Sequence, residues 1–284
     1  KETMPRQVFS SPELQSGTKL VIGKVTKIGD WAFFDTDNLK EIVIREGVTT
    51  IGESAFVGIG NIENLILPNT LKSIGKSAFS QSEIKSLVIP SGITTIPEDC
   101  FSWCEALETI TLPDTITTIE WGAFNQCRAL KAIALPNSIT TIEQAAFFQC
   151  EALETVTLPE YATIGSQAFQ GCGLTHITIP GGVSFGGDSL GTDVFAGNKK
   201  LTSVSILEGR TTIPAGLFRG CEALESVVIP YGVTSISSSF YQCYALKEVT
   251  IPRSVTEIGS SAFGYCTALE SIHYDASVHN WKNF

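Results

Sequence analysis

Long apolar runs and basic residues are both scarce in this sequence. It contains no run of 18 or more apolar residues, so it predicts no segment that inserts into a membrane. Its 19 lysine and arginine residues are outnumbered by 29 acidic residues, which gives a net charge of −10. Residues 93–284 hold nine of those basic residues and 19 of the acidic ones, so the surplus lies there. Because an acidic surface repels phosphate, we expect neither nucleic acid nor anionic lipid as a partner.

A strict internal repeat dominates the sequence instead. A phenylalanine is followed three residues later by a cysteine about every 23 residues, as in Phe124 and Cys127 or Phe147 and Cys150. Successive units are 22 or 23 residues long, except for one of 27, and eleven of them begin at Val25, Val48, Leu71, Ile93, Ile116, Ile139, Tyr161, Val183, Arg210, Val233 and Val255. A repeat of this length predicts small supersecondary units that stack, because one unit cannot bury its own apolar face.

The units follow the consensus V-T-x-I-G-x-x-A-F-x-x-C-x-x-L-x-x-I-x-I-P, whose slots indicate three short elements. Leu130, Ile133 and Leu135, followed by Pro136, are typical of a short strand that ends at the proline. The A-F-x-x-C slots place apolar residues three or four apart, which suits one turn of α or 3₁₀ helix. The β-branched segment 139–142 favours a second extended stretch. Together these elements predict one coil of a solenoid.

This pattern resembles the BspA-like leucine-rich repeat family of bacterial surface proteins over residues 25–277. The resemblance implies an α/β repeat solenoid, a right-handed leucine-rich-repeat superhelix with short strands on one face and short α or 3₁₀ turns on the other. It also implies a protein that is secreted or at the cell surface, a role in adhesion or host contact, and no catalytic residues. One slot departs from the wider superfamily, because Thr115 and Ser138 stand where a buried asparagine or cysteine is usual.

The two ends of the array predict caps. Residues 1–24 look like a degenerate half-repeat, and residues 278–284 form a C-terminal segment that resembles the cap of family members. The chain opens without a basic segment followed by an apolar one, so no export signal or anchor is recognisable in it.

The eight cysteines have a packing explanation and two chemical alternatives. Seven occupy the same slot of the repeat, and Cys100 replaces the alanine before a phenylalanine. In an exported chain, eight cysteines also suit a disulfide framework. A zinc site is disfavoured, because no C-x-x-C pair occurs and no histidine lies near Cys100 and Cys104. Other units fill the same slot with small or medium side chains, namely Thr36, Ile59, Ser82 and Asn198. We therefore predict buried free thiols, with no metal and no cofactor.

Catalytic residues are not predicted. Gly182, Ser184 and Gly186 match the G-x-S-x-G pattern of a nucleophile elbow, but they lie inside a repeat unit and not between a long strand and a helix. His176 and His273, two of the three histidines, fall on strands four repeats apart, which is roughly 20 Å by strand spacing. They share no metal or substrate at that distance, so the sequence predicts a protein that is not an enzyme.

Two regions are candidate binding sites. The outward slots of the predicted strands form two columns of small, β-branched and nearly uncharged residues, and repeat proteins commonly bind partners through such a face. A glycine-rich insertion, residues 181–195, interrupts the rhythm and is the second candidate. The predicted ligand-binding residues are Thr109, Thr111, Thr155, Thr157, His176, Thr178, Phe185, Asp188 and Asp193.

Each candidate site has an alternative interpretation. Threonine and valine suit strands whatever their function, and loops commonly tolerate insertions. A third candidate is a sticky outer patch of aromatic residues near the turns, although packing between turns explains these residues equally well. They are Trp31, Phe34, Trp103, Trp121, Phe148, Tyr241, Tyr244 and Tyr265.

The sequence therefore predicts a noncatalytic, surface-exposed or secreted module for protein binding or adhesion, which acts through the solenoid face. The expected partner is a surface or matrix protein of a host or neighbouring cell, and the module is expected to be a monomer. The alternative is a structural display or spacer domain without a ligand of its own.

Overall fold

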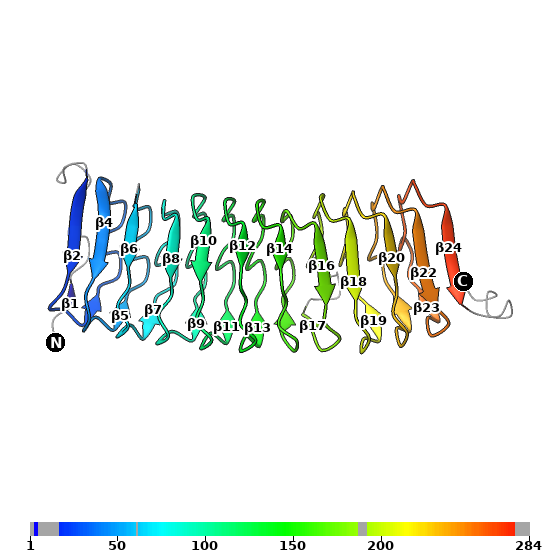
Figure 1. Cartoon of the computed structure of the whole chain (residues 1–284), viewed down its shortest axis with the longest axis horizontal. Helices are drawn as coiled ribbons and strands as arrows, with labels where there is room; N and C mark the ends of the chain where they lie inside the picture. Colours follow the sequence, from blue (N-terminus) through cyan, green and yellow to red (C-terminus); the bar gives the residue numbers. More distant parts are fainter. Residues whose placement is uncertain (1–2, 5–16, 61, 187–191, 276–284) are drawn as a thin grey trace.

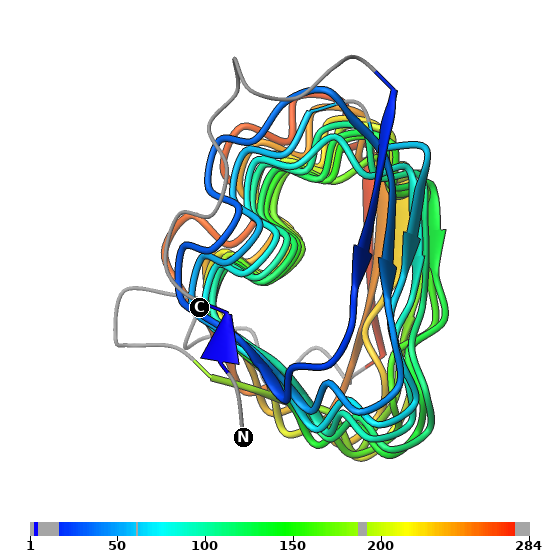
Figure 2. The ribbon, with the colours of Figure 1, turned by 90° about the vertical axis from the view of Figure 1, so that its left-hand side faces the viewer.

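The computed structural model describes residues 3–4, 17–60, 62–186 and 192–275. These residues form an elongated parallel β-solenoid of about eleven turns (Figure 1). Every strand pairing among them is parallel. Viewed along the axis, successive turns lie one behind another with nearly the same outline (Figure 2). The predicted solenoid is confirmed.

One series of strands forms the broad side of the solenoid that faces the viewer in Figure 1, and we call its outward surface the strand face. The series consists of β2 (Thr18–Ile22), β4 (Leu39–Ile44), β6 (Asn64–Ile66), β8 (Ser86–Val88), β10 (Thr109–Thr111), β12 (Ala132–Ile133), β14 (Thr155–Val156), β16 (His176–Ile179), β18 (Ser203–Ile206), β20 (Ser226–Val228), β22 (Glu248–Pro252) and β24 (Ser271–Asp275).

A second series of two-residue strands runs along the lower edge of the solenoid in Figure 1. It consists of β1 (Thr3–Met4), β3 (Lys27–Ile28), β5 (Thr50–Ile51), β7 (Ser73–Ile74), β9 (Thr95–Ile96), β11 (Thr118–Ile119), β13 (Thr141–Ile142), β15 (Thr163–Ile164), β17 (Ser184–Phe185), β19 (Thr212–Ile213), β21 (Ser235–Ile236) and β23 (Glu257–Ile258). From β3 onward, these strands are the predicted extended stretches near the start of each repeat unit.

Neighbouring strands pair in register, so each turn repeats the side-chain pattern of the turn before it. In β8 and β10, for example, Leu87 pairs with Ile110. Along β10 the central Ile110 is buried, whereas Thr109 and Thr111 are exposed. This alternation sends one apolar side chain per strand into the core and two side chains outward, as expected for a half-buried strand.

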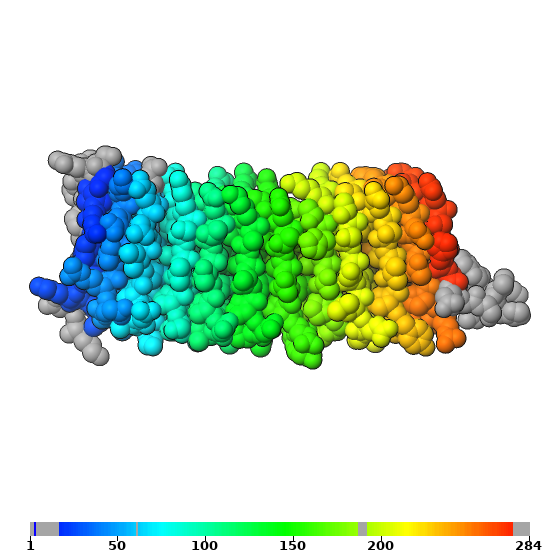
Figure 3. Space-filling model, in the orientation of Figure 1, coloured from blue at the N-terminus to red at the C-terminus, as the bar shows by residue number. Residues whose placement is uncertain are grey.

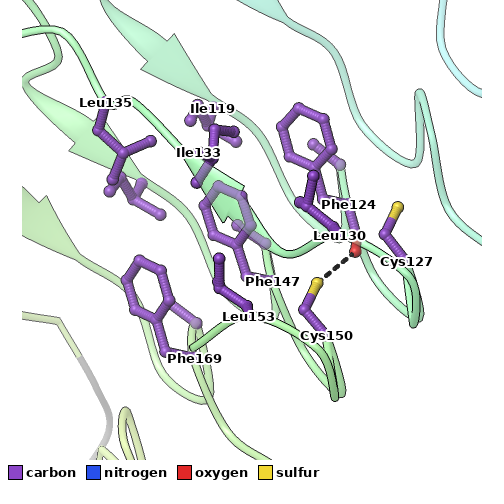
Figure 4. Packing of buried hydrophobic residues seen from close by; sticks show 14 of the residues in the cluster. Ile119, Phe124, Cys127, Leu130, Ile133, Leu135, Phe147, Cys150, Leu153 and Phe169 are labelled. Carbon is purple, nitrogen blue, oxygen red and sulfur yellow. Dashed lines mark hydrogen bonds between the residues drawn. The ribbon is translucent and has the colours of Figure 1, made fainter. Parts of the chain in front are cut away.

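A ladder of stacked phenylalanine rings runs through the core. It extends through every turn from Phe33 to Phe263, with neighbouring ring centroids 5.0–5.9 Å apart and ring planes within 17° of parallel. Figure 4 shows Phe124, Phe147 and Phe169 in this stack, with leucine and isoleucine side chains beside them. Each stacked pair contributes about 0.5–1.5 kcal/mol beyond the burial of its apolar area. The ladder therefore favours equal register between successive turns.

The predicted helical turn at the A-F-x-x-C slots is wrong, because the described residues contain no helix. In almost every unit, the residues two positions before and two positions after the phenylalanine have positive φ, as at Gly122 (59°) and Gln126 (61°). A positive φ interrupts a right-handed helix at that residue. The amides also alternate between partners: Phe124 N–H donates to Ala146 of the next turn at 2.8 Å, whereas Cys127 N–H donates to Phe124 at 3.2 Å.

These segments are therefore tight turns that also hydrogen-bond along the stack. Apolar residues three positions apart fit a helical turn and a tight turn equally well, so the spacing alone did not separate the two. In the described residues the solenoid is all-β, and not α/β as predicted. Its right-handed sense stays a prediction from the family resemblance.

The cysteine slot provides a hydrogen-bond donor to the preceding turn. Cys150 Sγ donates to the carbonyl oxygen of Phe124 at 3.2 Å (Figure 4). The same bond recurs in the six other units that have cysteine in this slot. Ser82 and Asn198 replace it with an Oγ or Nδ2 donor to the corresponding phenylalanine carbonyl, at 2.7 and 2.9 Å. The slot thus favours small side chains that donate a hydrogen bond to the preceding turn. Ile59, which has no side-chain donor, is an exception.

In some units a hydroxyl group occupies the slot where the family resemblance leads one to expect a buried asparagine or cysteine. Thr115 Oγ1 donates to the carbonyl of Ile93 at 2.7 Å, and Ser138 Oγ donates to that of Ile116 at 2.6 Å. Each bond connects a turn to the one before it. Other units, such as those with Gly92 or Gly232 in this slot, have no hydroxyl there, so these bonds connect individual turns and do not form a continuous ladder.

The predicted caps lie mostly outside the described residues. Of the predicted N-terminal half-repeat, β2 pairs in parallel with β4 and so continues the strand series. The predicted C-terminal cap, residues 278–284, lies entirely outside the described part of the chain.

Candidate functional site: the strand face

The two predicted outward columns lie in register on the strand face. Thr109 belongs to the first column and Thr111 to the second, and both are exposed on β10. Ser86 and Val88 of β8 pair with them and are also exposed. The buried Ile110 between the columns fixes the strand to the core. A partner that approaches this face therefore meets side chains held on a rigid scaffold.

A shallow hollow of about 310 Å³ lies on the strand face across β6, β8 and β10. Its lining includes Asn64, Ile66, Val88, Thr109 and Thr111, and none of its lining residues is charged. Val88 leaves 67% of its surface accessible. Apolar side chains beside amide and hydroxyl groups, with few charges, are typical of the central part of a protein interface. Figure 3 shows the strand face as one continuous broad surface.

The sequence prediction missed Asn64, Ile66 and Val88 in this hollow. The signal was present in the second outward column, which holds large apolar residues in its first turns. Val21 pairs with Val43, and Val43 with Ile66, so these residues form a stripe. Val21 and Ile66 are 40% and 44% exposed. Contiguous exposed apolar residues mark interaction surfaces more often than isolated ones do.

Four other predicted residues lie on the strand face but outside the hollow. Thr155 of β14 and Thr157 just beyond it are exposed, as are His176 and Thr178 of β16. His176 Nδ1 shares a hydrogen bond with Thr175 Oγ1 at 3.2 Å. The structure therefore brings Thr109 and Thr111 together with the hollow and leaves these four further along the same surface.

Phe185, predicted in the insertion, packs inside the solenoid edge. It lies in β17 of the second series and is half-buried. Its ring meets Phe195 edge-on at 6.2 Å between centroids, and the guanidinium carbon of Arg210 lies 4.6 Å from its centroid. Arg210 also donates to the carbonyl of Val183, and burial lowers the pKa of its guanidinium. Phe185 is thus not placed on the strand face.

Asp193, the one predicted aspartate of the insertion that the structure describes, is also separate from the strand face. Asp193 is half-buried beside Phe195, and its Oδ2 accepts a hydrogen bond from Arg219 Nη2 at 2.8 Å. Burial raises the pKa of Asp193, although the arginine acts in the opposite direction. Asp188 lies outside the described residues.

Serine, histidine and cysteine are residue types that often act in catalysis or bind metals, and their contacts here are structural. Ser184 Oγ shares a hydrogen bond with Thr163 Oγ1 at 3.0 Å, and His273 Nε2 lies 3.0 Å from Glu248 Oε1. All eight cysteines are free, and burial raises the pKa of the Cys104 thiol to about 12. Within the described residues, no three side chains of the metal-binding types lie close enough together to hold an ion. The described part also contains no helix with the length and hydropathy that a membrane span requires.

Solved structures share this architecture. A leucine-rich repeat protein from Bacteroides ovatus is 27% identical, with a TM-score of 0.67 over 95% of this chain and 81% of that one. A leucine-rich repeat protein from Eubacterium ventriosum is 20% identical, with a TM-score of 0.55 over 93% of this chain and 86% of that one. The pneumococcal vaccine antigen PcpA is 19% identical, with a TM-score of 0.57 over 96% of this chain and 81% of that one. The last two likenesses show the fold alone.

The sequence also matches a family model along nearly its whole length. No match was found among curated proteins. The model of the BspA type leucine-rich repeat region, in six copies, matches residues 2–92, 72–189 and 163–284. The repeat consensus, the parallel solenoid and these matches agree, and the chain belongs to the BspA-type leucine-rich repeat family.

Proposed function

We propose that this chain is a noncatalytic protein-binding module that acts at a bacterial cell surface or after secretion. The observation that carries the proposal is the uncharged hollow across β6, β8 and β10, which lies on a strand face with exposed apolar residues. Membership of a family of bacterial surface proteins supports the location and the interaction role. The partner is a surface or matrix protein of a host or neighbouring cell.

Two adjacent side chains of the hollow provide the test. Val88 and Thr111 are exposed partners in β8 and β10, so glutamate at both positions places two charges in the hollow without disturbing the core. The purified chain is screened by biolayer interferometry against extracellular matrix and cell-surface proteins. We expect V88E/T111E to weaken binding at least tenfold, because burying unpaired charges in an interface is costly. Asn137→Glu, at an exposed turn outside this hollow, is the matched control.

Three results are decisive. Loss of binding in V88E/T111E but not in N137E supports the proposal. Equal binding by both variants contradicts a role for the hollow. The absence of any saturable protein ligand contradicts the binding function and favours a spacer domain.

A further inference from the structure

A second hollow lies where the third repeat unit is one residue short. Most units place two residues between the cysteine slot and the next buried leucine, as between Cys104 and Leu107. The third unit has only Glu83 between the buried Ser82 and Ile84. A hollow of about 610 Å³ opens at this step.

Two successive turns line this hollow, which we call the step hollow. Its lining residues are Gln81, Ser82, Glu83, Trp103, Glu105 and Ala106. Trp103 is 45% exposed, so the hollow has an accessible indole ring with a carboxylate from each turn. No basic side chain is among the lining residues. An indole face and a carboxylate both attract cations, so this lining selects a positively charged group.

The chain already places a cation beside the same indole. The guanidinium carbon of Arg128 lies 5.9 Å from the Trp103 ring centroid, and its Nη1 lies 3.7 Å from Glu105 Oε1. Arg128 comes from the following turn and does not line the step hollow. The hollow, by contrast, opens between Trp103 and the preceding turn. It offers the same indole and carboxylate chemistry to a group from outside the chain.

The surrounding charge also favours a cationic ligand. Residues 93–160 contain ten acidic side chains, whereas Arg128 and Lys131 are the only basic ones. Lys131 is already paired with Glu108 at 2.7 Å. A cleft lined by one sign of charge concentrates ligands of the opposite sign.

The seventh unit provides an internal comparison. It is short at the same step, with Gly173 alone between its cysteine and leucine slots. In the following turn, Gly197 and Lys199 take the places of Trp103 and Glu105. The shortened step therefore recurs in this chain, but its cation-attracting side chains occur only at the third unit.

We propose that the step hollow binds a lysine or arginine side chain of the partner protein. The charged head lies against the indole of Trp103 between Glu83 and Glu105, and the aliphatic stem lies against Ala106. The natural partner depends on the protein-binding function proposed above, of which this is a second contact. The hollow itself is testable without knowledge of that partner.

The test uses short peptides and the indole N–H signal of Trp103 in a ¹⁵N–¹H correlation spectrum. The full chain is titrated with acetyl-Gly-Arg-Gly-amide, acetyl-Gly-Lys-Gly-amide and the neutral acetyl-Gly-Gln-Gly-amide. We expect the two cationic peptides to shift the Trp103 signal with Kd in the millimolar range, and the neutral peptide to leave it unchanged. The signal of Trp121, which is 41% exposed and does not line the hollow, is the internal control.

Conservative variants separate recognition from folding. Gln81, Gln126 and Gln149 occupy the Trp103 slot in nearby units with the same positive φ, so Trp103→Gln suits the local backbone. For this variant, binding is followed through the backbone amide signals of Glu105 and Ala106, and we expect it to weaken about threefold to fivefold. Glu105→Gln is expected to weaken it about twofold to fivefold, and more salt to weaken it further.

Other outcomes overturn the proposal. No shift with the cationic peptides, an equal shift with the neutral peptide, or an equal shift at Trp121 excludes a cation site. A shift with maltose or lactose but not with the peptides assigns the hollow to carbohydrate instead. The peptide titration measures binding at the step hollow alone, whereas the V88E/T111E variant changes only the strand face. The failure of one proposal is therefore distinguishable from the failure of the other.

Discussion

Replacing one ring in the middle of the phenylalanine ladder tests how the turns are held together. Phe124 is fully buried and stacks on Phe101 at 5.3 Å and on Phe147 at 5.1 Å. Leucine keeps an apolar side chain there but removes both stacked pairs. At about 0.5–1.5 kcal/mol for each pair, Phe124→Leu is expected to lower the free energy of unfolding by about 1–3 kcal/mol.

The end of the ladder provides the comparison. Phe263 is half-buried and stacks on Phe240 at 5.5 Å, so Phe263→Leu removes one pair and is expected to cost about half as much. Phe148→Leu, a half-buried position outside the ladder, is expected to be nearly neutral. Guanidinium chloride unfolding followed by circular dichroism measures all three variants. If Phe124→Leu is no more destabilising than Phe148→Leu, stacking is not what holds the turns in register.

The remaining predictions concern the buried thiols. Cys150→Ser is expected to change the melting temperature little, because Ser82 already fills this slot as a donor, whereas Cys150→Ala is expected to cost about 1–2 kcal/mol for a lost hydrogen bond and a small cavity. Equal melting temperatures for these two variants contradict the donor role. Burial raises the pKa of Cys104 and Cys243 to about 12 from an ordinary 9.0, so both stay protonated in the folded state while the unfolded chain loses these protons near pH 9. The contribution of these two thiols to the free energy of unfolding is therefore fully present below about pH 9 and is lost as the pH rises toward 12. Melting temperatures between pH 7 and 11 measure this decline, which is expected to be smaller in Cys104→Ser, and an identical slope in that variant refutes the assignment.

The sequence predicted the solenoid and its strands because both depend on slots that repeat many times. The alternation around Ile110 and the return of the same residue types every 22 or 23 residues determine which side chains are buried. The sequence did not predict the tight turns, since their difference from a helix lies in backbone φ at positions such as Gln126. Glutamine has no intrinsic preference for a positive φ. The hydrogen bond from the Gln126 amide to the next turn stabilises this backbone conformation.

The binding residues were predicted only in part. Thr109 and Thr111 were identified from the composition of the outward columns, and both line the hollow on the strand face. Val88 was missed because an exposed valine and a strand-forming valine look alike in sequence. Trp103 was identified only as one of several scattered aromatic residues. The step hollow forms where the third unit, one residue short beside Glu83, stacks on the next turn, so the sequence of a single unit does not reveal it.

The cross-turn amide bonds determine the curvature of the array. A repeat array bends when its two sides have different spacings, as when helices about 10 Å wide lie opposite strands about 4.8 Å apart. Here the side opposite the strand face consists of turns whose amides, such as that of Phe124, bond directly to the next turn at 2.8 Å. Both sides then advance by nearly the same distance per turn, and the strand face does not become the concave side of a horseshoe: in Figure 2 the middle turns lie further toward the strand side than either end. A partner therefore does not meet a concave surface that encloses it, so its contact area grows with the number of turns that it spans.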